Sequence, residues 1–326
     1  MNGNLETRER LTYLNTGRWG DSSAIMQASS RWYEALRIPA DLVREGRLHP
    51  YAEFLANEVS AGERLSLPQQ ELLEAPPSVD ASPTNPATWA FSQTSPDEAL
   101  LRELTARTES TGWKVEPPSA ETESMLASAV DLLETLGNGL TDPLRFTRRH
   151  LVVRSDRLVG RTWVDVGGVI VSGIPGAFES IETLAESIYH ESLHAKFYAV
   201  ERQLNEPTPD LADDQLVVRV PWQQDLDGKP QRWNAHRALD AYYVYAHLGV
   251  LRSLLLSRSR SERDLDRLRR VCFRAAYLNR QIEATCLNII DAERLAIWGW
   301  LDGGRVREFD LSVEGRALLE DARVAA

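Results

Sequence analysis

The sequence predicts a mainly helical protein with a small antiparallel β-sheet, in the α+β class. Most of the chain carries apolar residues at the spacing of amphipathic helices. Sequence typical of β-strands, rich in β-branched residues and partly alternating, is confined to the segments 145–154 and 158–172, where Gly167 and Gly168 allow a bend. The second of these segments leads directly into a predicted helix, 181–200, that carries a polar stripe. We therefore expect the sheet to support that helix.

The composition of the chain limits the classes of protein to which it can belong. The chain has 326 residues, of which 43% are hydrophobic, enough for a substantial core. Its apolar runs fall far short of the ~20 residues that span a bilayer, and no signal region opens the chain, so we expect a cytoplasmic protein without a membrane partner. The net charge of −11 argues against a nucleic-acid partner. Cys272 and Cys286 fall in or directly beside predicted helices, which favours small hydrophobes over a disulfide.

The Pro- and Ser-rich stretch 76–86 is the best candidate for a boundary. It predicts an N-terminal helical region and linker over 1–87 and a metal-binding domain over 88–326, with one continuous domain as the alternative. Ser180 is a predicted N-cap and Gly137 a predicted helix stop. The predicted helices cover 21–36, 50–59, 68–74, 95–107, 119–136, 181–200, 232–255, 262–282, 287–300 and 311–325.

The motif His190-Glu191-Ser192-Leu193-His194 carries the chemistry. On a helix it places two imidazoles one turn apart with a carboxylate beside them, which is the signature of a metal site. Glu186 lies one turn before His190 on the same face and is placed to orient one imidazole by a hydrogen bond. Because a polar stripe in a core helix needs partners, the sequence predicts that a divalent cation binds both histidines.

A second polar stripe occurs in the predicted helix 232–255. His236, Asp240, Tyr243 and His247 lie at offsets of four, seven and eleven residues, on one narrow face. Apolar residues cover much of the rest of this helix. We therefore expect the second stripe to be buried against the first, with the metal site between two core helices.

Zinc peptidases are the first class that such a motif suggests, since their two histidines hold the ion and the glutamate is the general base. Metzincins are excluded, because Phe197 and Val200 stand where that class needs glycine and histidine. Thermolysin-like enzymes take a glutamate from a following helix, whereas Glu201 and Glu206 lie too near the motif to fold back. A zinc metallopeptidase acting on a peptide stays open as an alternative.

Several segments resemble bacterial HExxH-motif proteins of ribosomally made, modified peptide pathways, some of which are iron(II)- and 2-oxoglutarate-dependent peptide hydroxylases. The resemblance covers roughly the second half of the chain. It lies in the predicted β segments and Pro175-Gly176, in 189–196, in Pro221-Trp222 and in 244–250. The resemblance implies an oxidoreductase, a dioxygenase that hydroxylates a side chain of a ribosomally made precursor peptide. A non-catalytic peptide-binding partner is a further alternative.

The resemblance also implies roles for single residues. His190 and His194 would bind iron(II), with His247 as third ligand or His236 in its place; those two lie about 16 Å apart along a helix, so only one can reach the ion. Arg219 and Arg237 are the candidates for holding the distal carboxylate of 2-oxoglutarate. Many relatives carry a basic residue directly after Pro-Trp, where this chain has Gln223. Residues expected to act near the ion are Glu191, Glu186, Tyr243 and Asp240.

Overall fold

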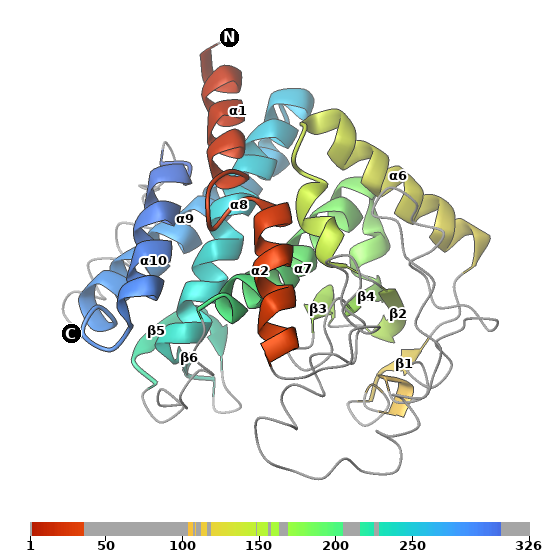
Figure 1. Ribbon diagram of the computed structural model, residues 1–326. Coiled ribbons are helices and arrows are strands. Elements are labelled where there is room, and N and C mark those ends of the chain that lie inside the picture. The colour runs from red at the N-terminus through yellow and green to blue at the C-terminus, as the bar shows by residue number, and fades with distance from the viewer. Residues whose placement is uncertain are drawn as a thin grey trace. The chain divides into compact units, whose positions relative to one another are not determined.

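The computed structural model describes residues 2–35, 104–106, 108, 112–115, 119–147, 149–155, 158–162, 169–204, 216–224 and 228–307. The chain divides into two compact units, which are described separately: unit 1 comprises Met1–Gly20 and Glu206–Ala326, and unit 2 comprises Asp21–Asn205. The boundary predicted at residue 87 falls outside the described residues and stays a prediction. The mainly helical α+β class is confirmed (Figure 1).

Unit 2 contains a four-stranded sheet in the order β1-β2-β4-β3. The two outer strands pair antiparallel, but the central strands β2 and β4 are parallel over seven residue pairs. The expected wholly antiparallel sheet is therefore wrong at its centre. Both central strands begin with five buried residues in succession, a pattern typical of strands covered on both faces. The strands are β1 (Lys114–Val115), β2 (Arg149–Ser155), β3 (Gly160–Thr162) and β4 (Val169–Pro175).

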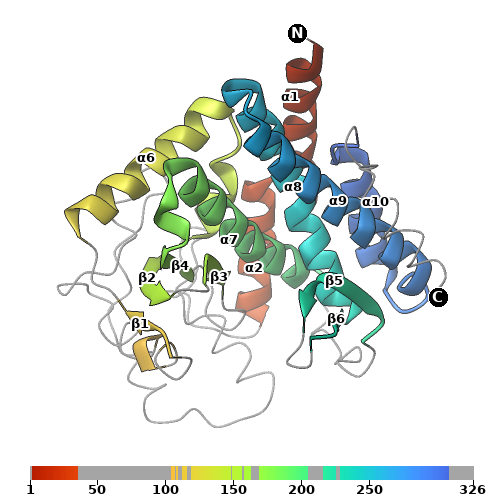
Figure 2. The same ribbon diagram turned by 180° about the vertical axis from the view of Figure 1, so that it is seen from behind.

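The motif helix α7 (Ile181–Arg202) packs on this sheet through β3 and β4 (Figure 2). It begins as predicted at Ser180, whose side chain accepts a hydrogen bond from the Thr183 amide at 3.2 Å. The helix α6 (Ala120–Leu136) lies beside it and ends, as predicted, at Gly137. Helix α2 (Ser22–Ala35) and a 3-10 helix, η3 (Asp142–Phe146), complete the packing around α7. A further 3-10 turn, η4 (Ala177–Glu179), joins β4 to α7.

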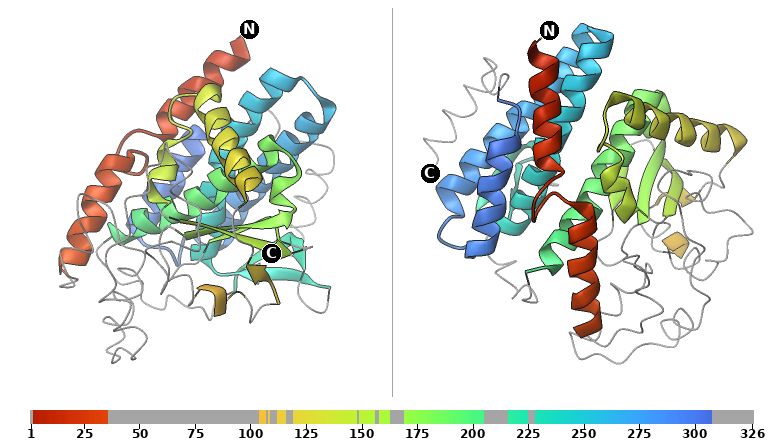
Figure 3. Two further views of the ribbon diagram at one scale, coloured as in Figure 1. Left: turned by 90° about the vertical axis from the view of Figure 1, so that its right-hand side faces the viewer. Right: turned by 45° about the horizontal axis from the view of Figure 1, so that its top comes forward.

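The described residues of unit 1 form helices and one hairpin. Helix α8 is buried at every residue from Ala238 to Arg252, and α9, α1 and α10 pack against it (Figure 3). The hairpin of β5 and β6 packs on α8 and α9. The elements are α1 (Asn2–Leu14), β5 (Val218–Gln224), β6 (Pro230–Trp233), α8 (Ala235–Ser259), α9 (Glu262–Thr285) and α10 (Ala292–Gly304).

Several predicted boundaries differ from the structure. The helix expected from 232 begins at Ala235, because 230–233 pairs with β5, and the hairpin itself was not predicted. The helix expected from 287 begins at Ala292 behind its N-cap Asp291. The strand expected from 145 begins at Arg149, after the 3-10 helix. Helix α1 was not predicted. The helices expected at 50–59, 68–74 and 311–325, and most of 95–107, lie outside the described residues.

None of the described helices combines the length and the apolar character that a membrane span requires.

Candidate metal centre

The polar stripe predicted on α7 is present. Between Leu184 and Val200, only Glu186, His190, His194 and Tyr198 are half-exposed, and the other residues of the segment are buried. These four recur every fourth residue and therefore share one face of the helix. Glu186 takes the predicted place one turn before His190. Its role in orienting that imidazole stays a prediction.

The two motif histidines converge on one point. Their Nε2 atoms lie 3.2 Å apart, and the rings are tilted by 59° with centroids 5.0 Å apart. Two imidazole nitrogens that each lie about 2.1 Å from one ion are about 3.4 Å apart at the tetrahedral angle and about 3.0 Å apart at a right angle. The measured separation falls between these values. The pair therefore fits two neighbouring ligand positions of a tetrahedral or octahedral ion.

Glu191 is buried beside this pair. Its side chain is held by strand β3, where the hydroxyl of Thr162 donates a hydrogen bond to Oε2 at 2.7 Å. The other carboxylate oxygen, Oε1, lies 3.9 Å from Nε2 of His190. At that distance the carboxylate lies next to the ligand nitrogen and can accept a hydrogen bond from a molecule held by the same ion.

The second polar stripe lies on α8 in unit 1. Asp240, Tyr243 and His247 are buried, and His236 is half-buried near the start of the helix. Nδ1 of His247 lies 2.8 Å from the carbonyl oxygen of Tyr243. Since a carbonyl can only accept, Nδ1 carries the proton, and the lone pair of the neutral ring is on Nε2. This is the tautomer that a metal-binding Nε2 requires.

Aromatic rings surround His247 within unit 1. The ring of Tyr243 lies 4.4 Å away between centroids, and Trp300 of α10 lies 6.2 Å away. Trp300 also packs on Tyr13 of α1, at 6.2 Å. The imidazole is therefore fixed by packing on two sides as well as by its hydrogen bond.

The two arginines predicted to hold 2-oxoglutarate are both exposed in unit 1. Arg219 of β5 stands directly opposite Arg232 of β6, and the guanidinium of Arg237 stacks over Trp233 at 4.7 Å. Like charges directly opposite each other on a hairpin are unfavourable unless an anion lies between them. The anchoring role of both arginines stays a prediction.

Trp222, part of the Pro-Trp segment that carries the resemblance, is the centre of an aromatic cluster. It meets four rings edge-on, and the guanidinium of Arg274 lies 5.5 Å from its ring centroid. The packing explains why a large aromatic residue stands here, joining the hairpin to α9. The four rings are Trp233, Tyr245, Phe273 and Tyr277.

Sequence reasoning missed three residues near the motif helix. Thr162 and Gly160 of β3 contact Glu191, and His150 of β2 lies in register with Ile170, which is in register with Thr162. Residues in register on neighbouring strands share a face, so His150 points to the α7 side of the sheet. Alternation along 160–162 is the signal that pairs Gly160 with Thr162. No local signal marks His150.

Within the part of the chain that the structure describes, no group of three or more histidine, cysteine, aspartate or glutamate residues is arranged to hold a metal ion. No known family model matches the sequence, and no curated protein is a detectable relative. Unit 2 thus holds the candidate metal centre, the His190–His194 pair with Glu191. In unit 1, His247 is described by itself as a candidate ligand.

Proposed function

We propose that this protein is an iron(II)- and 2-oxoglutarate-dependent oxygenase that hydroxylates a side chain of a ribosomally made precursor peptide. The observation that supports a metal enzyme is the 3.2 Å separation of the His190 and His194 Nε2 atoms, beside the buried carboxylate of Glu191. The choice of iron, 2-oxoglutarate and a peptide substrate is supported by the sequence resemblance described above.

Neutral imidazoles leave the charge of a divalent ion uncompensated. A site made of histidines therefore suits a dianionic 2-oxo acid as a further ligand. When bound, iron(II) with 2-oxoglutarate and oxygen inserts one oxygen atom into a C–H bond of the substrate and places the other in succinate, with release of carbon dioxide. In this proposal His190 and His194 hold the ion, and Glu191 orients a neighbouring molecule by accepting a hydrogen bond.

His247 is the proposed third ligand. Its Nδ1 proton is held by the Tyr243 carbonyl, so its Nε2 has the lone pair that a cation needs, and its ring is fixed by Tyr243 and Trp300. His236 is half-buried and remains the substitute. Asp240 and Tyr243 are proposed to act near His247, as the sequence predicts.

A zinc metallopeptidase is the second candidate, and one observation favours it. Oε1 of Glu191 lies 3.9 Å from His190 Nε2, where a carboxylate can take a proton from a water molecule that attacks a peptide bond. The two candidates need different things from Glu191, and substitution of this residue therefore separates them.

Metal content measured on anaerobically purified protein tests the metal site. Wild type should bind one equivalent of iron(II) or zinc, and His190→Ala and His194→Ala should each lose it, because two remaining ligands hold the ion weakly. His247→Ala against His236→Ala identifies the third ligand, with the other variant as its matched control. Full metal content in both motif variants would exclude the site.

Turnover tests the reaction, and a search of the genes beside this one for a short encoded peptide supplies the substrate to try. We expect succinate to form from 2-oxoglutarate and the peptide to gain one oxygen in mass without cleavage. Glu191→Gln should keep its metal and lose about 10- to 100-fold in turnover, as for loss of an orienting contact. Peptide cleavage without 2-oxoglutarate, abolished in Glu191→Gln, would instead identify the peptidase.

A further inference from the structure

Strand β3 lies against both oxygens of the Glu191 carboxylate, with a hydrogen bond to one of them. The hydroxyl of Thr162 lies 2.7 Å from Oε2 and 3.1 Å from the backbone carbonyl oxygen of Glu191. On the other side, a Cβ atom added to Gly160 would lie only 2.6 Å from Oε1. One oxygen therefore accepts a hydrogen bond from Thr162, and the other lies where the Cβ of a larger residue at position 160 would stand.

The alternation of the strand places both contacts on one face. Gly160 and Thr162 are two residues apart, so their side-chain positions point the same way, towards α7. Arg161 between them points to the opposite face and is exposed. The three-residue strand thus offers Glu191 a space at one position and a hydroxyl donor at the other.

The hydrogen bond from Thr162 is important because Glu191 is only 5% exposed. A buried carboxylate without hydrogen bonds is costly, and a glutamate side chain has several rotamers among which to distribute. The Thr162 hydroxyl satisfies Oε2 and selects one rotamer. In that rotamer the remaining oxygen, Oε1, is the one that lies 3.9 Å from His190 Nε2.

We propose that Thr162 is a positioning residue that turns Oε1 of Glu191 towards the ion held by His190 and His194, and that Gly160 provides the room for this rotamer. The inference rests on the proposed metal site. It holds for either reaction, because both need the carboxylate beside the ion. Because Oε2 accepts the hydrogen bond from Thr162, Oε1 is the oxygen placed to orient a molecule held by the ion.

Metal affinity of the purified full-length protein tests this role without any substrate. Cobalt(II) is the probe, with affinity measured by chelator competition and ligand geometry by the visible absorption spectrum. Thr162→Val keeps the shape and removes the hydroxyl, and we expect it to weaken cobalt binding about 10-fold and alter the spectrum. Thr162→Ser keeps the hydroxyl and should restore both properties. Arg161→Ala, on the opposite face of the same strand, is the matched control and should resemble wild type.

A double-mutant cycle separates positioning from a merely structural effect. If Thr162 acts through Glu191, Thr162→Val should change nothing further once Glu191→Ala is present, in affinity or in spectrum. Equal effects of Thr162→Val with and without Glu191 would overturn the proposal, as would wild-type affinity in Thr162→Val. Thermal unfolding of the metal-free variants checks the fold, and Thr162→Ala replaces Thr162→Val if that variant does not fold.

The same titration distinguishes the failure of this inference from that of the proposed function. Absence of cobalt binding by the wild type would refute the metal site and the role of Thr162 with it. Binding that depends on His190 and His194 but not on Thr162 would leave the metal site intact and refute only the positioning role.

Discussion

Four of the histidines that the structure describes occupy three kinds of environment. His190 and His194 are half-exposed and face each other, and His247 is buried with its Nδ1 proton held by a carbonyl. His150 is 1% exposed, and neither of its ring nitrogens has a hydrogen-bond partner among the described residues. The first two environments suit metal ligands. The third makes His150 a neutral core residue whose protonation is costly.

The buried imidazole of His150 predicts a specific loss of stability in acid. Burial lowers its pKa from 6.5 to about 3. Because the folded-state pKa lies below that of the unfolded chain, the unfolded chain binds the proton first as the pH falls. The free energy of unfolding should therefore decrease by about 1.4 kcal/mol per pH unit between the two pKa values.

Urea unfolding of wild type and His150→Phe at pH 7, 6, 5 and 4 measures this effect. Phenylalanine fills a similar volume and cannot be protonated. The free energy of unfolding of His150→Phe should therefore decrease less as the pH falls, and the decrease that remains should come from the carboxylates. The two proteins should diverge steadily from pH 6 to pH 4. Parallel pH dependences would show that His150 does not contribute.

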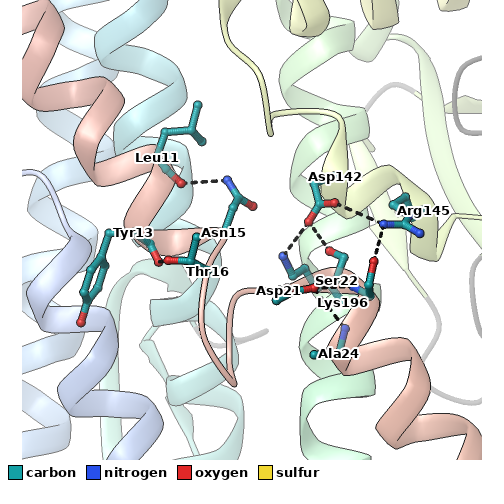
Figure 4. A network of polar contacts seen from close by, with 11 residues as sticks. Leu11, Tyr13, Asn15, Thr16, Asp21, Ser22, Ala24, Asp142, Arg145 and Lys196 are labelled. Atoms are coloured by element: carbon teal, nitrogen blue, oxygen red, sulfur yellow. Dashed lines mark hydrogen bonds and ion pairs between the residues drawn. The ribbon is translucent and has the colours of Figure 1, made fainter.

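At the scale of the element, α7 is anchored on its buried side by a charged residue. Nζ of Lys196 is fully buried and lies 3.4 Å from Oδ2 of Asp142, which also accepts a hydrogen bond from Ser22 of α2 (Figure 4). Arg145 lies 3.8 Å from Oδ1 of the same carboxylate. One carboxylate on η3 thus ties α7 and α2 together, and it lies on a different side of α7 from the histidine stripe.

The two members of this pair should respond unequally to mutation. Burial lowers the pKa of Lys196 to about 8, and Asp142 opposes that decrease. Asp142→Asn leaves a buried ammonium group without its counter-ion and should cost about 3–5 kcal/mol. Lys196→Met removes the buried charge, and Asp142 keeps Ser22 and Arg145, so the cost should be smaller.

Chemical denaturation of both single variants and of the double variant checks this order. Adding Lys196→Met to Asp142→Asn should recover part of the lost stability, because it removes the unpaired ammonium. Since the lowered pKa of Lys196 means that protonation disfavours folding, Asp142→Asn should also gain stability as the pH rises from 7 to 9. A double variant that is less stable than Asp142→Asn would contradict this account.

At the scale of the whole molecule, the only two cysteines report on opening of the packed structure. Cys272 and Cys286 are free and buried, as the sequence predicts, and burial raises the pKa of the Cys286 thiol. A thiol reacts as the thiolate, which both burial and the raised pKa suppress. Modification of either cysteine therefore requires opening of α9.

We expect a thiol reagent not to react rapidly with the native protein. In denaturant, two equivalents of the reagent should react, one for each cysteine. The rate in increasing urea should follow unfolding measured by fluorescence, since the reactive state is the open one. Cys272→Ala and Cys286→Ala assign each equivalent. Rapid reaction of one thiol in the native state would show that part of α9 opens locally.

Much of the candidate site can be predicted from the sequence because its signals are local. The spacing of His190, Glu191 and His194 defines their mutual geometry on any helix, and Ser180 marks where that helix begins. The four-residue spacing of Glu186, His190 and His194 likewise predicts one polar stripe on the helix, and the burial pattern of α7 shows this stripe. The proposed third ligand and the proposed arginine anchor for 2-oxoglutarate depend on residues far from the motif in the sequence, and both stay predictions.

By itself, the sequence determined the α+β class, the motif helix with its N-cap, and the residues of the proposed cation site, because helix periodicity, capping and ligand spacing act over a few residues. The tertiary structure alone decided that β2 and β4 pair in parallel, that Thr162 donates a hydrogen bond to Glu191 beside Gly160, and that His150 is buried with no hydrogen-bond partner among the described residues. Each of these depends on residues that are far apart in the chain and meet only when the sheet and α7 pack together.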